Sequence, residues 1–198
     1  KHFKWNEFFL AVIEKFNQAT HLQHSLVRAY WYNAETITPF DSNPRPELID
    51  AFINEHSSMV PGLTRDRIVE LARSWWERER DNFDYTRSTV FEGIQRRNDF
   101  LDFSYVGQYS IRPYTAHRIS LNPDGTIWYQ GKRMGERGVD VGIAVDMISK
   151  TDNYDVGILI SGDVDFVPAI AHIKSQLKNF YQFSLAKGIP PRIHHLSP

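Results

Sequence analysis

The sequence predicts an α/β protein in which a mostly parallel sheet is flanked by helices, and one stretch carries most of that prediction. Asp155–Ile160 is a short apolar run with β-branched residues, which is typical of a strand buried on both faces. Directly after the turn Ser161–Asp165, apolar residues recur at helical spacing from Phe166 to Leu177. In open sheets built from such strand–helix units, ligands bind at the carboxyl edge, where this turn lies.

The turn between the predicted strand and helix contains two carboxylates, Asp163 and Asp165. We expect Asp165 to be the N-cap of the helix, and Pro168 fits in the first turn, where its missing N–H has no partner to lose. Two like charges this close repel each other unless a cation lies between them. Carboxylate oxygens suit Mg²⁺ or Mn²⁺, so a metal site is our expectation. The alternative is that both acids only cap the helix and complement its dipole.

A third acid lies on a helix predicted over Glu136–Ile148. Apolar residues on nearly all sides predict that this helix is largely enclosed, where a carboxylate needs a partner. Asp140 is near the helix start, so we expect it at the same sheet edge as Asp163. Asp146 lies almost two turns further on and points elsewhere, so we expect it to have a structural or supporting role.

These acids stand in a recognisable pattern. GVDVGIAVDMIS at residues 138–149, followed by YDVGILISGDVDFVPAI at residues 154–170, resembles the signature of the NYN domain, a branch of the PIN-like nuclease superfamily. Val27–Ala34 resembles the second strand of that family, and together the resemblance covers most of the chain. It implies a Rossmann-like, PIN-like sheet whose carboxyl edge binds Mg²⁺ or Mn²⁺ for RNA cleavage. The implied catalytic and metal-binding residues are Asp140, Asp163 and Asp165.

The ends of the chain depart from the pattern of the family. The family normally opens with a strand that ends in an Asp, whereas this sequence begins at Lys1, inside what resembles the following helix. The final strand and closing acidic segment of the family are not evident before Pro198. We therefore expect residues 1–198 to be a single NYN/PIN-like domain that lacks its first strand because the sequence is a trimmed fragment. An inactive relative is the alternative.

Composition narrows the field further. An apolar fraction of 41% is enough for a core, and a net charge of −1 gives no global basic field of the kind many nucleic-acid binders have. The absence of cysteine excludes disulfides, thiolate zinc sites and cysteine nucleophiles. The sequence has no apolar run of membrane-spanning length and no signal-peptide pattern. A cytoplasmic protein without a membrane partner is the expectation.

The chain before these motifs is predicted to supply helices and one more strand. Lys1–Gln18 has the spacing of an amphipathic helix, and Leu26–Tyr32 is predicted to be a strand parallel to Asp155–Ile160. Residues from about 46 to 102 are predicted to form a helical insertion, with a last helix over 88–101. Its Trp75 and Trp76 are expected to pack in a core more often than to stack on RNA.

A β-hairpin is predicted around the turn Asn122–Gly125, and basic residues follow it close in sequence to Asp140. Basic side chains next to aromatic ones suit contacts with RNA phosphates and bases. An ordinary solvated loop is the equally weighted alternative. The candidate RNA-contacting residues are Lys132, Arg133, Arg137 and Ser161, and the candidate stacking aromatics are Tyr114, Trp128 and Tyr129.

The function we expect is metal-dependent hydrolysis of phosphodiester bonds in single-stranded or structured RNA. Two alternatives remain open. Asp163–Val167 also matches the D-x-D-x-V motif of haloacid-dehalogenase-like phosphatases, in which the first Asp is a nucleophile, but here the motif comes late in the chain instead of on the first strand. The second alternative is an inactive RNA-binding or protein-interaction module. The sequence leaves the oligomeric state open, with a homo-oligomer as one option.

Overall fold

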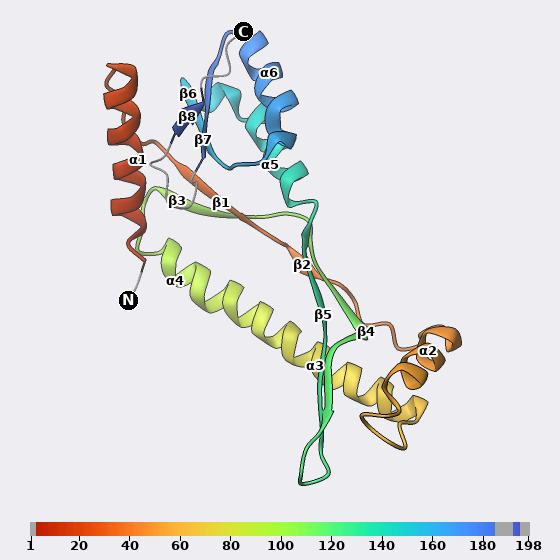
Figure 1. Ribbon diagram of the computed structural model, residues 1–198. Coiled ribbons are helices and arrows are strands. Elements are labelled where there is room, and N and C mark those ends of the chain that lie inside the picture. The colour runs from red at the N-terminus through yellow and green to blue at the C-terminus, as the bar shows by residue number, and fades with distance from the viewer. Residues whose placement is uncertain (1–2, 185–191, 195–198) are drawn as a thin grey trace. The chain divides into compact units, whose positions relative to one another are not determined.

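The structure is a computed structural model that describes residues 3–184 and 192–194 (Figure 1). The chain forms two compact units. Unit 1 is built from residues 1–32, 98–104 and 138–198, and unit 2 from residues 33–97 and 105–137. Helices and parallel strand pairs occur together, so the chain has the α/β fold that the sequence predicts. The single domain over residues 1–198 stays a prediction.

Unit 1 combines helices with a three-stranded sheet and a separate pair of strands. The β6–β7–β8 sheet contains the parallel pair β6–β7, with partners running from Val156 with Asn179 to Ile160 with Phe183. In the order of the chain, the elements are α1 (Trp5–Thr20), β1 (Ala29–Asn33), β3 (Leu101–Tyr105), α5 (Val139–Ser149), a 3₁₀ turn (Thr151–Asn153), β6 (Val156–Ile160), a second 3₁₀ turn (Val164–Phe166), α6 (Val167–Ser175), β7 (Asn179–Ser184) and β8 (Arg192–His194).

The β6–α6–β7 crossover has a dense core. Buried Ile170 and Ile173 of α6 pack with Met147 of α5 and Phe180 of β7. Gly157 in β6 has no room for a side chain, because a Cβ there would lie 2.3 Å from the Phe180 ring. The strand and helix predicted from the apolar run and the helical spacing after it are therefore confirmed, and the glycine lets the strand approach the aromatic ring closely.

The first helix of unit 1 packs against β7 through an aromatic pair, and the first strand pairs with β3. α1 buries Phe9, Val12 and Phe16, as its amphipathic pattern predicts. The Phe16 ring meets the Tyr181 ring of β7 edge-on at 4.9 Å between centroids. β1 takes β3 as its paired neighbour, so the strand predicted over Leu26–Tyr32 forms its ladder with a later segment of the chain and not with β6.

The prediction that the helix over Glu136–Ile148 is largely enclosed is wrong. α5 begins only at Val139, and Val141 and Val145 are 67% and 58% exposed. α5 packs mainly against α6 and the 3₁₀ turn that follows it, through a face that includes Ile143 and Met147. Apolar residues on every side of a helix predict burial only where every side has a neighbour.

Unit 2 is a three-stranded sheet with helices packed against it. The sheet order is β2–β4–β5, with β2 parallel to β4 and β4 antiparallel to β5, and the last two strands form the long hairpin in Figure 1. In the order of the chain, the elements are β2 (Thr36–Ile37), α2 (Pro46–His56), α3 (Arg65–Tyr85), a π-helical turn (Thr86–Phe91), α4 (Glu92–Gln95), β4 (Gln108–Leu121) and β5 (Ile127–Arg137).

The core of unit 2 centres on α3. Trp75 is 2% exposed, and a Cβ at Gly131 of β5 would lie 2.6 Å from its ring. Trp76 donates its indole N–H to the carbonyl of Thr38 at 2.7 Å. Both tryptophans therefore pack within unit 2, as predicted. The helix predicted over residues 88–101 is wrong beyond Gln95, since Leu101 already begins β3.

Candidate functional site

The turn after β6 is fixed by hydrogen bonds from several directions. The Ser161 hydroxyl oxygen accepts the Asp163 N–H at 3.1 Å, and the Asp163 carboxylate accepts the Asp165 N–H at 2.9 Å. Gln182 of β7, which is 8% exposed, donates its side-chain amide to the carbonyls of Ser161 at 2.8 Å and Asp163 at 2.9 Å. Because parallel pairing places β7 beside β6, Gln182 anchors the turn that carries the two acids.

The structure corrects the predicted N-cap. The capping residue is Asp163, which opens the short 3₁₀ turn Val164–Phe166, and α6 follows with Phe166 before it and no side-chain cap. Asp165 lies inside the 3₁₀ turn, so an extra turn of helix moves the cap two residues upstream. Pro168 lies in the first turn of α6, as predicted. The side chains of Asp163 and Asp165 are both exposed, so their carboxylates are open to an external ligand.

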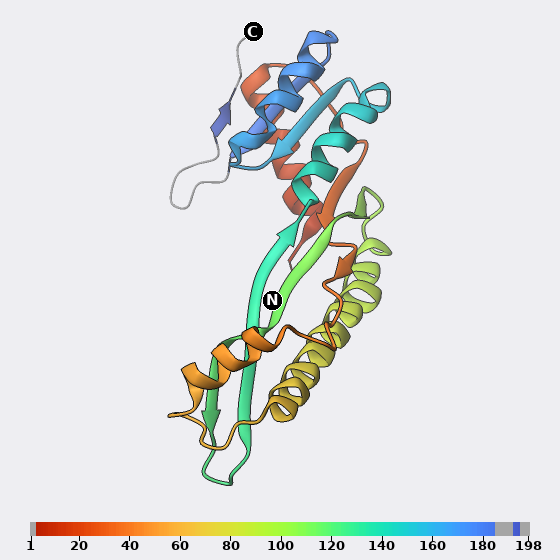
Figure 2. The same cartoon turned by 90° about the vertical axis from the view of Figure 1, so that its right-hand side faces the viewer.

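Asp140 lies in the first turn of α5 and is also exposed. Figure 2 shows that α5 begins and β6 ends at the same end of unit 1, which is the relation expected between Asp140 and Asp163. Nevertheless, residues 3–184 and 192–194 contain no group of three or more acidic, histidine or cysteine side chains close enough to hold a metal ion. Asp140, Asp163 and Asp165 therefore do not form a ready-made ligand set in the described part of the chain.

Asp146 is engaged inside unit 1. Its Oδ2 accepts the Tyr32 hydroxyl at 3.0 Å and the Lys150 ammonium at 2.5 Å, and Lys150 Nζ also lies 4.1 Å from the centroid of the Tyr30 ring. Burial, reinforced by the hydrogen bond to Asp146, raises the pKa of Tyr32. Tyr32 is thus a protonated donor at neutral pH, and Asp146 joins α5 to β1.

The basic residues expected in a loop after the hairpin lie on a strand. Lys132 and Arg133 both belong to β5, where successive side chains project to opposite faces. Arg133 pairs with Ile111 and donates two hydrogen bonds to Glu79 of α3, at 2.7 and 2.6 Å. The Glu79 side chain is only 11% exposed, so the charge of Arg133 is balanced on the α3 side of the sheet. Lys132 projects to the opposite side and is exposed.

The other candidate RNA contacts also differ in whether their side chains are exposed. Arg137 is the last residue of β5 and is exposed, and Ser161 is half-buried in the turn after β6. Tyr114 and Tyr129 cannot stack on bases, because they are 6% and 4% exposed in the core of unit 2 and their hydroxyls bond backbone carbonyls. Trp128 is 43% exposed and is the candidate that keeps an open ring.

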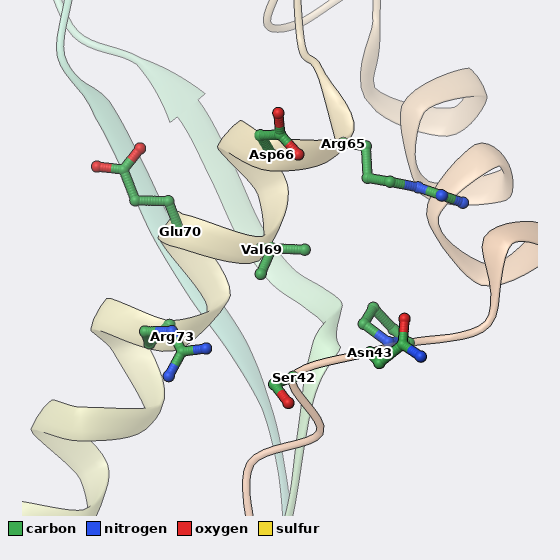
Figure 3. Close-up of a pocket in the computed structure, with 8 residues that line it drawn as sticks. Ser42, Asn43, Arg65, Asp66, Val69, Glu70 and Arg73 are labelled. Atoms are coloured by element: carbon green, nitrogen blue, oxygen red, sulfur yellow. The ribbon is translucent and has the colours of Figure 1, made fainter.

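Two open cavities are lined by described residues of unit 2. The larger, of about 460 Å³, lies between α3 and the segment Ser42–Pro44, and Figure 3 shows Val69 between Arg65 and Arg73, with Glu70 directed away from that segment. Its two arginines are matched by Asp66 and Glu70, so its lining has no excess charge to attract a phosphate. The smaller, of about 270 Å³, is lined by the ion pair Glu79–Arg133 and by Arg87 and Glu136, which are again balanced.

The sequence model of the NYN domain family matches residues 86–192, just over half of the 198 residues. This chain belongs to the NYN domain family. The match begins at the π-helical turn and includes the hairpin, α5, β6, α6 and β7, so all the predicted site residues lie within it. The NYN domain is a PIN-like α/β domain associated with RNA and with nuclease activity. Comparisons with curated proteins and with solved structures found no match.

Two residues that organise the site escaped the sequence analysis. Gln182 holds the acidic turn through hydrogen bonds to residues 19 and 21 positions earlier in the chain. Tyr32 holds Asp146, which lies 114 positions later. Nothing in the local pattern around either residue marks it. The available signal for Gln182 was the parallel pairing of its strand with β6, which places a polar side chain of β7 near the end of the neighbouring strand.

The structure also describes no helix with the length and apolar character needed to cross a bilayer.

Proposed function

We propose that this NYN domain hydrolyses phosphodiester bonds of RNA, with Asp140, Asp163 and Asp165 binding Mg²⁺ or Mn²⁺. The observation that carries the proposal is the hydrogen-bonded acidic turn at the carboxyl end of β6, inside the segment that matches the family. In open α/β folds, ligands bind at the carboxyl edge of the parallel strands, and the carboxylates of this turn lie at that edge. Family membership favours this reaction over the phosphatase alternative.

The three acids are the right type of ligand for a divalent ion, but the structure does not bring three of them together. Exposed carboxylate oxygens are the ligands that Mg²⁺ and Mn²⁺ prefer. Among the residues that the structure describes, however, no three such side chains are gathered for one ion. The proposal therefore requires Asp140 to approach the Asp163–Asp165 turn when the ion binds, and we assign no chemical step to the ion. The role given to this chain is to hold Asp163 and Asp165 at a fixed, solvent-open edge.

Metal binding can be tested apart from catalysis. We expect Mn²⁺ to broaden the NMR signals of Asp140, Asp163 and Asp165 and their neighbours before those of other acids. The variant Asp163→Asn keeps an oxygen that accepts the Asp165 N–H but removes the charge, so the turn survives and ion affinity falls. Asp152→Asn is the matched control, because Asp152 is another exposed aspartate of unit 1. Equal broadening at Asp152 and at the turn would contradict the assignment.

Cleavage is the second test. Wild-type protein with Mg²⁺ or Mn²⁺ is expected to cut single-stranded RNA. Asp163→Asn is expected to lose that activity, Asp152→Asn to keep it, and a chelator to abolish it in every variant. Retained cleavage by Asp163→Asn would rule out the proposed site.

A second candidate function is RNA binding or protein interaction without cleavage. One observation favours it: among the described residues, no three acidic side chains are gathered closely enough to hold one ion. The same experiments separate the two candidates. An inactive module binds RNA equally well with and without a chelator, shows no selective Mn²⁺ broadening at the turn, and leaves the RNA intact.

A further inference from the structure

The outer face of the β4–β5 hairpin, which is turned away from α3, gathers cations around one open aromatic ring. In the ladder, Arg112 is opposite Lys132, Arg118 is opposite Gln130, and Ser120 is opposite Trp128. The register shifts in β4 between Arg112 and Ala116 and again between Ala116 and Arg118, whereas the β5 partners from Trp128 to Lys132 are consecutive. Directly opposite residues of an antiparallel pair project to the same face. The intervening residues Ile111, Ile119 and Tyr129 are buried with α2 and α3, which fixes the orientation of both faces. We call Arg112, Arg118, Trp128, Gln130 and Lys132 the hairpin outer face.

The cations of this face are exposed and unbalanced. Within the described part of the chain, neither Arg112, Arg118 nor Lys132 has a side-chain hydrogen bond or an ion pair. Arg133, one position from Lys132 on the other face, is by contrast held by Glu79. Like charges directly opposite in a ladder are destabilising, and that is the arrangement of Arg112 and Lys132. An anion bound between these two side chains would relieve the repulsion.

The exposed ring of Trp128 indicates which kind of anion the hairpin outer face binds. Its ring is 43% exposed on the same face, next but one to Gln130 along β5. A basic surface that follows a backbone, combined with an aromatic ring on which a base stacks, is the arrangement by which proteins bind single-stranded nucleic acid. A membrane surface would require a broad apolar patch, and Trp128 is the one large apolar side chain of this face.

We propose that the hairpin outer face binds single-stranded RNA, with Arg112, Arg118 and Lys132 on successive phosphates and Trp128 stacked on a base. The choice of RNA rests on the proposed function, whereas the phosphate and stacking contacts follow from the hairpin itself. The proposal adds two residues to the candidate RNA contacts, Arg112 and Arg118, and keeps Lys132 and Trp128. It removes Arg133, because the charge of Arg133 is already balanced by Glu79.

Binding is measured with a fluorescently labelled oligouridine in the presence of a chelator and in the Asp163→Asn background, so that the RNA stays intact. The triple variant Arg112→Gln, Arg118→Gln, Lys132→Gln is expected to reduce the slope of log affinity against log salt by about 2, from about 0.7 for each lost phosphate contact. Trp128→Ala is expected to weaken binding about tenfold at constant salt slope. An oligomer without bases should bind wild type and Trp128→Ala equally.

The control removes the same charge elsewhere in unit 2. The variant Arg45→Gln, Arg65→Gln, Arg78→Gln replaces three other exposed arginines and should bind RNA like wild type within about twofold. Because the hairpin substitutions remove a repulsion, the hairpin triple variant should unfold at a temperature no lower than that of wild type. Folding is thereby checked apart from binding.

Several results would overturn the proposal. They are unchanged RNA affinity in the hairpin triple variant, an equal loss in the control triple variant, or binding to vesicles that contain phosphatidylserine with no binding to RNA. The nuclease proposal fails separately. If wild-type protein never cuts RNA but the hairpin variants lose binding, the inference about the hairpin holds and the proposed function falls. If cleavage depends on Asp163 but the hairpin variants bind normally, the opposite conclusion follows.

Discussion

Gln182 donates its side-chain amide to the backbone carbonyl of Asp163 at 2.9 Å, and thereby ties the end of one strand to the middle of its parallel neighbour. The same amide nitrogen also donates to the Ser161 carbonyl at 2.8 Å. Because Gln182 is buried, bulk water has little access to replace these hydrogen bonds. The precision of the acidic turn therefore depends on a residue that carries no charge and lies outside the motif.

Replacing Gln182 with Met tests this dependence. The change conserves most of the side-chain volume but leaves two carbonyls without their donor, so we expect the free energy of unfolding to fall by about 1–3 kcal/mol. Urea denaturation measures it. Gln176→Met is the control, because Gln176 is exposed and its side chain hydrogen-bonds to His172 on the surface. Equal stability of the two variants would show that the buried amide contributes nothing.

The cap at Asp163 makes a prediction about stability that is separate from activity. Asp163→Ala removes the acceptor of the Asp165 N–H and should cost about 1 kcal/mol of unfolding free energy. Asp163→Asn keeps an acceptor and should cost only a few tenths of that amount. Thermal or urea unfolding of the two variants gives the comparison. If both lose the same stability, the carboxylate acts through its charge and not as a cap.

Gly157 is predicted to tolerate no side chain. A Cβ at this position would lie 2.3 Å from the Phe180 ring, so Gly157→Ala should lower the free energy of unfolding by about 1–3 kcal/mol. Phe180→Leu opens space, so the double variant should lose less stability than the sum of the two single variants. Gly93→Ala in α4 is the control, since the nearest atom is the end of a flexible arginine at 3.8 Å, and it should not destabilise.

The raised pKa of Tyr114 predicts how the free energy of unfolding changes at alkaline pH. Burial, with a smaller contribution from the nearby charge of Asp41, raises the pKa of Tyr114 to about 12. Because the folded-state pKa exceeds the unfolded value of about 10, the unfolded chain releases this proton first. The stability is fully present below pH 10 and falls by up to about 1.4 kcal/mol per pH unit as the pH rises towards 12. Tyr114→Phe should remove this part of the alkaline decline, and an unchanged slope would contradict the assignment.

The local part of this fold could be predicted from the sequence. The apolar run before Ser161 and the helical spacing after it give β6 and α6, and the turn Asn122–Gly125 gives the hairpin. In both cases the signal lies within about ten consecutive residues, where side-chain periodicity and turn chemistry decide the backbone. The family was predicted for the same reason, since its two acidic motifs are local patterns.

The remainder depends on contacts that a local pattern does not contain. Exposure of Val141 and Val145 reflects which face of α5 meets α6, and the shifted cap at Asp163 reflects a 3₁₀ turn too short to have its own period. Lys132 and Arg133 look equivalent in sequence but differ in their surroundings, because strand register assigns them to opposite faces and only Arg133 meets Glu79. The grouping of Asp140 with the acidic turn stays a prediction for the same reason.

The alternation along β5 also limits how this hairpin can change in length. Residues added in pairs at its distal turn would extend the strands and leave the two faces as they are. One residue inserted between Gly131 and Lys132 would reverse the direction of everything after it, turning the lysine towards Glu79 and the neighbouring arginine outward. The parity of the strand, more than the identity of any one side chain, therefore determines which charge is presented and which is neutralised.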